Sequence, residues 1–199
     1  ERGFGLRGST GTPDRGHTAV SQLKPGDVDW ERIFSHEGAR WLHLGGIFAG
    51  LSETCAELTL EAAKTARKHG TRVSYDMNYR ASLWKSRGGV PAAREINRMI
   101  APYVDVMIGN EGHFRSILGS DESDPSDLPQ DPRERFEFST DSVLSDFPNL
   151  HALAATVRSE RSASRNDWGA IGRSAEGLQT SSFRENLRSE EHTSELQSP

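Results

Sequence analysis

The sequence contains a single cysteine, Cys55, among 199 residues. A disulfide framework is therefore excluded, and a reducing, cytoplasmic compartment is the expected environment. No apolar run approaches the roughly 20 residues of a membrane-spanning helix, so no membrane partner is expected. Basic residues are outnumbered, with 24 Lys and Arg against 29 Asp and Glu and a net charge of −5. Nucleic-acid surfaces need clustered positive charge, so no nucleic-acid partner is expected either.

Several common catalytic motifs are also missing. The histidines show no HxxxH or Cys/His spacing, which argues against a zinc site. There is no GxSxG, no GxxxxGK[ST], and no GxGxxG between a strand and a helix. The sequence is therefore not that of a typical α/β-hydrolase, P-loop protein or dinucleotide-binding domain.

What the sequence does contain is an alternation of short apolar strands and amphipathic helices. Strands are predicted near residues 40–45, 71–76, 104–108 and 150–157, with a fifth beginning at 168–172. Helices are predicted near residues 29–36, 53–69, 90–103 and 110–119. This order is the βαβ signature, so we expect an α/β fold with a mainly parallel sheet, right-handed crossovers and helices on both faces.

Details of the helices and loops can be predicted in the same way. Ser52 is the expected N-cap of the first long helix, and Gly70 the residue that ends it. In the helix near 90–103, Ile96, Met99 and Ile100 are expected to face inward. Residues 120–137 hold three prolines and seven acidic residues and are interpreted as a loop insertion without core capacity, followed by a weak helix over 139–147.

Polar or small residues follow three of the predicted strands. They are Gly45 and Gly46, then Asp76, Asn78 and Arg80, and finally Gly109, Asn110 and Glu111. Ligands in parallel sheets sit beyond the carboxyl ends of the strands. Arg80 suits a carboxylate or phosphate, whereas Asp76 and Glu111 suit sugar hydroxyls or, through water, Mg²⁺. Each residue alone is also typical of an ordinary turn or helix cap.

Longer segments resemble a known family. The stretches RGHTAVSQLKPGDVDWERIF, ARWLHLGGIFAGLSE, GTRVSYDMNYRASLWKS, INRMIAPYVDVMIGNE and NDWGA are similar to 2-keto-3-deoxygluconate kinases of the ribokinase-like (PfkB) sugar-kinase family. The resemblance covers residues 1–118 strongly and 147–187 moderately. It implies a ribokinase-like three-layer α/β fold, with residues 1–22 contributing to a small β lid. It also implies ATP and Mg²⁺ as co-reactants and a sugar acid as the small-molecule substrate.

The resemblance also implies roles for individual residues. Substrate-binding residues would be Arg15, Asp76, Asn78 and Arg80. Residues near the nucleotide would be Asn110, Glu111, Thr156 and Arg158, with Glu111 on the metal side. The full-length protein is a candidate homo-oligomer.

Two departures from the family pattern bear on activity. The family's NxxE-like motif has an acidic fourth residue, whereas this chain has His113 there. The GAGD-type loop that carries the family's catalytic aspartate has no counterpart, and neither has the opening GGxxxN-type motif. We therefore expect a partial kinase domain over residues 1–187 that is inactive by itself.

The C-terminal stretch RSEEHTSELQSP, residues 188–199, resembles the in-frame translation of a sequencing adapter and is interpreted as a non-native, disordered tail.

Two other interpretations of the chain remain open. It could be a non-catalytic sugar-binding or regulatory module, or a family member with fructokinase- or ribokinase-like specificity.

Overall fold

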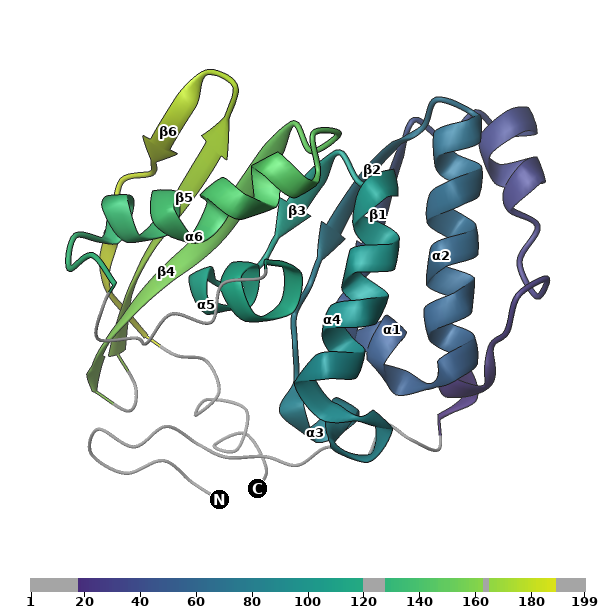
Figure 1. Ribbon diagram of the computed structural model, residues 1–199, viewed down its shortest axis with the longest axis horizontal. Coiled ribbons are helices and arrows are strands. Elements are labelled where there is room, and N and C mark those ends of the chain that lie inside the picture. Colours follow the sequence, from purple (N-terminus) through teal and green to yellow (C-terminus); the bar gives the residue numbers. More distant parts are fainter. Residues whose placement is uncertain (1–17, 120–127, 163–164, 189–199) are drawn as a thin grey trace, which may run out of the picture.

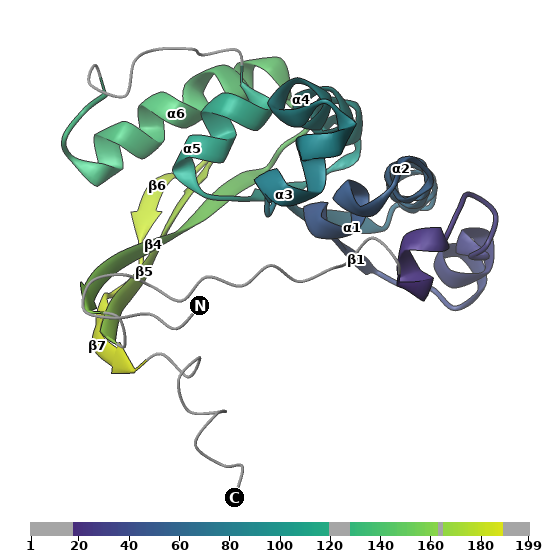
Figure 2. The same cartoon turned by 90° about the horizontal axis from the view of Figure 1, so that it is seen from below.

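The computed structural model describes residues 18–119, 128–162 and 165–188. Within them the sheet has the order β1-β2-β3-β4-β5-β6 (Figure 1), with β7 also paired to β5 (Figure 2). The strands β1 to β4 run parallel, and β5, β6 and β7 extend the sheet in antiparallel pairs. The strands are β1 (Trp41–Gly45), β2 (Arg72–Asp76), β3 (Val106–Ile108), β4 (Ala152–Ser162), β5 (Arg165–Ser174), β6 (Gly177–Thr180) and β7 (Arg184–Arg188).

Helical segments connect the parallel strands. They are α1 (Gly46–Leu51), α2 (Glu53–Lys68), α3 (Ala81–Trp84), α4 (Gly89–Ile100), α5 (Glu111–His113) and α6 (Pro132–Asp146), with shorter 3-10 or π turns η1 (Ala19–Gln22), η2 (Arg32–His36), η3 (Lys85–Arg87), η4 (Ala101–Tyr103) and η5 (Phe114–Leu118).

The expected α/β fold is thus confirmed. The Ser52 side chain caps α2 by accepting from the Cys55 amide, as predicted, and Gly70 follows the helix with a positive φ of 71°.

The α-helices of the described residues cover one face of the sheet (Figure 2), where the sequence pattern predicted helices on both. The strand order gives the reason. Each strand from β1 to β4 is added next to its predecessor in the same direction, so every right-handed crossover falls on the same side. Alternate residues such as Val73, Tyr75, Met107 and Leu153 pack under the helices and are fully buried. On the opposite face, Trp41 is 57% exposed.

Helix α4 faces the core with Ile100 as predicted and with Ile96 partly buried against it, but not with Met99. Its buried positions are Ala93, Asn97 and Ile100, whereas Met99 is 47% exposed and Ile96 is half-buried. The inward placement of Met99 was therefore wrong. Asn97 can occupy the buried stripe because its side-chain Nδ2 donates to the Ala93 carbonyl one turn earlier, which satisfies that donor inside the helix.

The segment predicted as a loop over residues 120–137 is partly helical. Residues 120–127 lie outside the described part, but α6 begins at Pro132 rather than at 139. The Asp131 side chain caps it by accepting from the amides of Arg133 and Glu134, and proline suits the first helical position. Phe136 is fully buried against Phe114, so this stretch does contribute to the core.

The two ends of the chain bear on other expectations. Residues 1–17, including most of the proposed lid segment, lie outside the described residues, and Ala19–Gln22 form a 3-10 turn. At the other end, Arg188 was assigned to the tail, but it pairs with Arg165 as the last residue of β7. The rest of the tail lies outside the described residues. No helix in the described ranges has the length and apolar character needed to cross a membrane.

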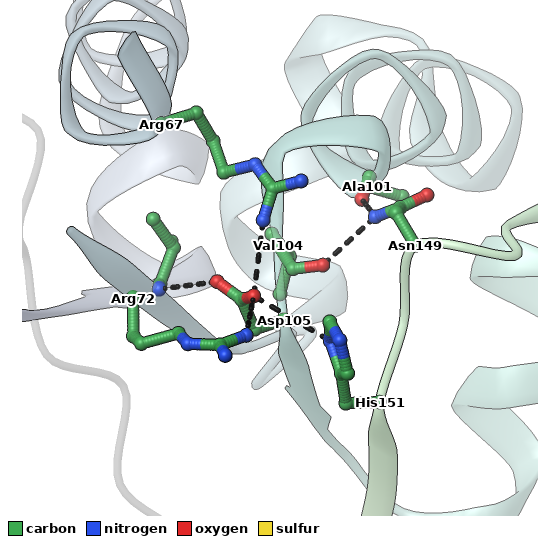
Figure 3. A network of polar contacts seen from close by, with 8 residues as sticks. Arg67, Arg72, Ala101, Val104, Asp105, Asn149 and His151 are labelled. Carbon is green, nitrogen blue, oxygen red and sulfur yellow. Dashed lines mark hydrogen bonds and ion pairs between the residues drawn. The ribbon is translucent and has the colours of Figure 1, made fainter. Parts of the chain in front are cut away.

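Asp105 joins three strands and a helix at the edge of the sheet where the parallel strands begin (Figure 3). Its carboxylate accepts from the Val73 amide at 2.8 Å and from the guanidinium groups of Arg72 and Arg67 at 2.7 and 3.0 Å. The His151 ring lies 3.5 Å away. This network holds β2, β3, α2 and the start of β4 together at the end of the sheet opposite the candidate site.

Candidate active site

The carboxyl ends of the four parallel strands lie at one edge of the sheet. Gly45, Asp76, Ile108 and Ala154 are level with one another in the strand register. The polar residues that follow β2 and β3 therefore start from neighbouring positions. This is the edge at which open α/β sheets bind ligands.

Gly46 allows the chain to pass very close to β2 at this edge. A Cβ added at Gly46 would lie 1.9 Å from the Met77 carbonyl oxygen, whereas one added at Gly45 would meet nothing within 4 Å. The glycine pair was predicted to leave room for backbone or ligand. At Gly46 it is backbone that approaches.

The residues after β2 form a tight turn. The Asp76 carboxylate accepts from the Asn78 amide at 3.1 Å, and Asn78 adopts a positive φ of 33°. Arg80 follows in extended conformation as the residue before α3. Among the described residues, its exposed side chain makes one hydrogen bond, a long one of 3.4 Å to the Tyr79 carbonyl, so the guanidinium has donors to spare there. Arg15, the other predicted arginine, lies outside the described residues.

His113 connects this turn to the residues after β3. Its ring contacts Tyr79 edge-on, with the centroids 5.8 Å apart, and its Nε2 lies 3.2 Å from the side-chain Nδ2 of Asn110. The pKa of His113 is lowered because burial disfavours the imidazolium, and the positive charge of Arg80 lowers it further, while Asp76 opposes the shift. A neutral ring therefore stands where the family pattern has an acidic side chain.

A polar cavity of about 410 Å³ opens beside the ends of β3 and β4. All four residues predicted to lie near a nucleotide line it, namely Asn110, Glu111, Thr156 and Arg158. Asn110 also caps α5 by accepting from the His113 amide at 2.8 Å. Arg158 is held by a hydrogen bond from its Nε to Asn166 at 3.0 Å, and its guanidinium stacks over Trp168.

Arg135 is a charged residue of the cavity that the sequence pattern missed. It lies in the first turns of α6, and its Nε donates to both carboxylate oxygens of Glu111, at 2.7 and 2.9 Å. The Asp131-Pro132 pair is an N-cap followed by a proline at the first helical position, and could have revealed the helix start. The pairing with Glu111 had no sequence signal.

Another cavity, of about 580 Å³, lies at the opposite edge of the sheet, where β1 and β2 begin. Arg40, Trp41 and Arg72 are among its lining residues. Its position is remote from the carboxyl ends of the strands, and none of the predicted site residues that the structure describes lines it. The cavity beside β3 and β4 is therefore the better candidate for the active site.

Comparison with known proteins identifies the family to which the chain is similar. Residues 14–131 match the model of the pfkB family of carbohydrate kinases. Over 140 residues the chain is 31% identical to a 2-dehydro-3-deoxygalactonokinase of Haloferax volcanii, which covers 70% of this chain and 42% of the relative. The chain thus spans less than half the length of that relative.

Solved structures with the same fold include carbohydrate kinases. A 2-dehydro-3-deoxygluconokinase of Thermotoga maritima superposes with a TM-score of 0.77 at 30% identity, covering 92% of this chain and 52% of the other. A PfkB family carbohydrate kinase of Listeria grayi gives a TM-score of 0.74 at 22% identity, covering 94% and 52%, and shows the shared fold.

Proposed function

Since the chain belongs to the PfkB family of carbohydrate kinases, we propose that it forms the sugar-acid side and part of the nucleotide side of an ATP-dependent sugar-acid kinase. The substrate class is a 2-keto-3-deoxy sugar acid such as 2-keto-3-deoxygluconate. The single observation that carries the proposal is the cavity lined by Asn110, Glu111, Thr156 and Arg158, which His113 links to the turn that holds Asp76 and Arg80.

Each side of the site would have its own task. Arg80 would bind the substrate carboxylate through two parallel charge-assisted hydrogen bonds, with Asp76 and Asn78 beside it for sugar hydroxyls. Thr156 and Arg158 would hold phosphate oxygens of ATP. Phosphoryl transfer depends mainly on such positioning and on charge stabilisation, and both substrates would meet near His113.

Magnesium is the metal that the family implies. Within the described ranges no three His, Cys, Asp or Glu side chains gather into a metal-binding group. Mg²⁺ in nucleotide sites is usually held by one or two carboxylates together with substrate phosphates, so the single carboxylate of Glu111 in the cavity fits that pattern. When bound, the ion would offset negative charge on the phosphates.

The 199-residue chain itself should transfer no phosphate. The aspartate that would accept the proton of the sugar hydroxyl belongs to a glycine-rich loop without counterpart in this sequence. Incubation of the purified chain with ATP and 2-keto-3-deoxygluconate should give product at background level. Turnover well above background would contradict this expectation.

Substrate class can be tested in a chimaera. This chain up to Leu187 is joined to the corresponding C-terminal part of the Thermotoga maritima 2-dehydro-3-deoxygluconokinase, and ATP consumption is measured with 2-keto-3-deoxygluconate, fructose and ribose. The proposal expects the highest kcat/KM for the sugar acid, and a preference for fructose or ribose would overturn it. Calorimetric titration of the 199-residue chain with the sugar acid and with ATP provides a second test that needs no chimaera.

A further inference from the structure

The ion pair between Glu111 and Arg135 leaves most of the N–H donors of the guanidinium unused. The two residues come from different elements, α5 and α6, and their side chains are only 25% and 33% exposed. Glu111 is bound through the Arg135 Nε alone, at 2.7 and 2.9 Å. A guanidinium carries five N–H donors in a fixed plane, so four of them, on the two Nη atoms, are not used by Glu111.

Those four donors have no partner in the part of the chain that the structure describes. Within residues 18–119, 128–162 and 165–188, the hydrogen bonds and ion pair of the Arg135 side chain are those to Glu111 alone. Arg135 nevertheless lines the 410 Å³ cavity together with Thr156 and Arg158. The pair with Glu111 restricts the rotation of a long side chain, so the direction of the Nη edge is fixed before any ligand arrives.

The charge of the cavity favours an anion. Two of its three charged lining residues are arginines, Arg135 and Arg158, and the third is Glu111. The two arginines come from separate elements, α6 and β4. Thr156, two residues before Arg158 in β4, adds a hydroxyl to the lining. The planar N–H donors of a guanidinium group match the spacing of oxygens in phosphates and carboxylates.

We propose that Arg135 is a phosphate-binding residue of this cavity and that Glu111 is the residue that positions it. The ligand chemistry is a phosphate chain such as that of a nucleoside triphosphate. The inference rests on the proposed function for the identity of the ligand. It does not rest on the family match, which ends at residue 131. A sugar-acid carboxylate would offer similar chemistry, but Arg80, on the turn after β2, is the arginine nearer to that side.

The test is calorimetric titration of the 199-residue chain with inorganic tripolyphosphate, ATP and 2-keto-3-deoxygluconate. R135A should weaken tripolyphosphate and ATP binding about tenfold to hundredfold and leave sugar-acid binding within twofold. R135K keeps the charge but loses both the Nε anchor and the fork, so it should recover only a minor part of the affinity.

Two further variants complete the design. R133A removes an equal charge two residues away on α6, from an exposed side chain that does not line the cavity, and should leave all three affinities within twofold. E111Q keeps a neutral acceptor for Nε but weakens the anchor. If Glu111 positions Arg135, R135A should have a clearly smaller effect in the E111Q background than in the wild type.

Every outcome has a definite meaning. Equal weakening by R135A and R133A would show only a general charge effect and would overturn the inference, as would full recovery with R135K. ATP binding that is the same in the wild type and R135A would refute the role of Arg135 while the proposed function stands. Loss of sugar-acid binding in R135A would show that the Arg135 guanidinium binds the carboxylate of the sugar acid, and would overturn the phosphate assignment. No binding of ATP or tripolyphosphate to the wild type would refute both. Melting curves verify that each variant is folded.

Discussion

The Asp105 carboxylate and the Arg72 guanidinium lie 2.7 Å apart at the end of the sheet opposite the candidate active site (Figure 3). Asp105 is almost completely buried, with a side chain 2% exposed, whereas Arg72 is 54% exposed. A second arginine, Arg67 of α2, and the Val73 amide donate to the same carboxylate. A buried charge with this set of partners ties β2 and α2 to the start of β3, so removing it should lower the stability of the whole domain.

Asp105→Asn should lower the free energy of unfolding by about 2 kcal/mol, because the side chain would keep its shape but lose the charge that satisfies two arginines. Urea unfolding followed by circular dichroism measures this change. Asp141→Asn is the matched control, since Asp141 pairs with Arg173 while 64% exposed, and exposed ion pairs contribute little. Equal effects of the two substitutions would contradict the central role of Asp105.

Stability should also depend on pH through Asp105. Burial raises its pKa, but the hydrogen bond from the Val73 amide and the charges of Arg72 and Arg67 outweigh this, and the pKa lies below its usual range. The stabilisation is therefore fully present above the unfolded pKa of about 4 and is lost as the pH falls through the folded pKa. The difference in unfolding free energy between wild type and Asp105→Asn should shrink between about pH 4 and pH 2. A constant difference over this range would refute the prediction.

Gly46→Ala should destabilise the fold by about 2–3 kcal/mol or more, because the new methyl group would overlap the backbone carbonyl of Met77. Gly45→Ala is an adjacent control with open space around the added carbon and should change stability by less than about 1 kcal/mol. Thermal unfolding of both variants gives the comparison. If the two variants melted at the same temperature, the close approach of Gly46 to the Met77 carbonyl would be wrong.

In the chimaera, Arg80→Ala should lower kcat/KM for the sugar acid about 30- to 1000-fold, or roughly 2–4 kcal/mol, by leaving the substrate carboxylate unpaired. The KM for ATP should change little. Arg80→Lys should recover only part of the loss, because a point charge lacks the fork geometry. Steady-state kinetics with each substrate varied in turn separates the outcomes. A rise in the KM for ATP alone would remove Arg80 from the sugar side.

The sequence by itself determined the alternation of strands and helices and the edge where a ligand would bind. Hydrophobic periodicity is a local property, so the segments at 40–45, 71–76 and 104–108 could be recognised as strands without knowledge of their neighbours. Because the ends of parallel strands meet at one edge, Asp76, Arg80 and Asn110 could be grouped before the structure was known. The resemblance to sugar kinases supplied the roles that the site residues are expected to play.

Only the tertiary structure decided which faces and side chains meet. Because the strands β1 to β4 follow one another in sequence order across the sheet, the α-helices of the described residues lie on one face. In α4, packing against the core buries Asn97 and leaves Met99 exposed, which hydrophobic periodicity did not predict. Glu111 and Arg135 are 24 residues apart in the sequence, and Arg67 and Asp105 are 38 apart. Contacts over such distances leave no local pattern, because they form only when the crossovers between strands bring their elements side by side.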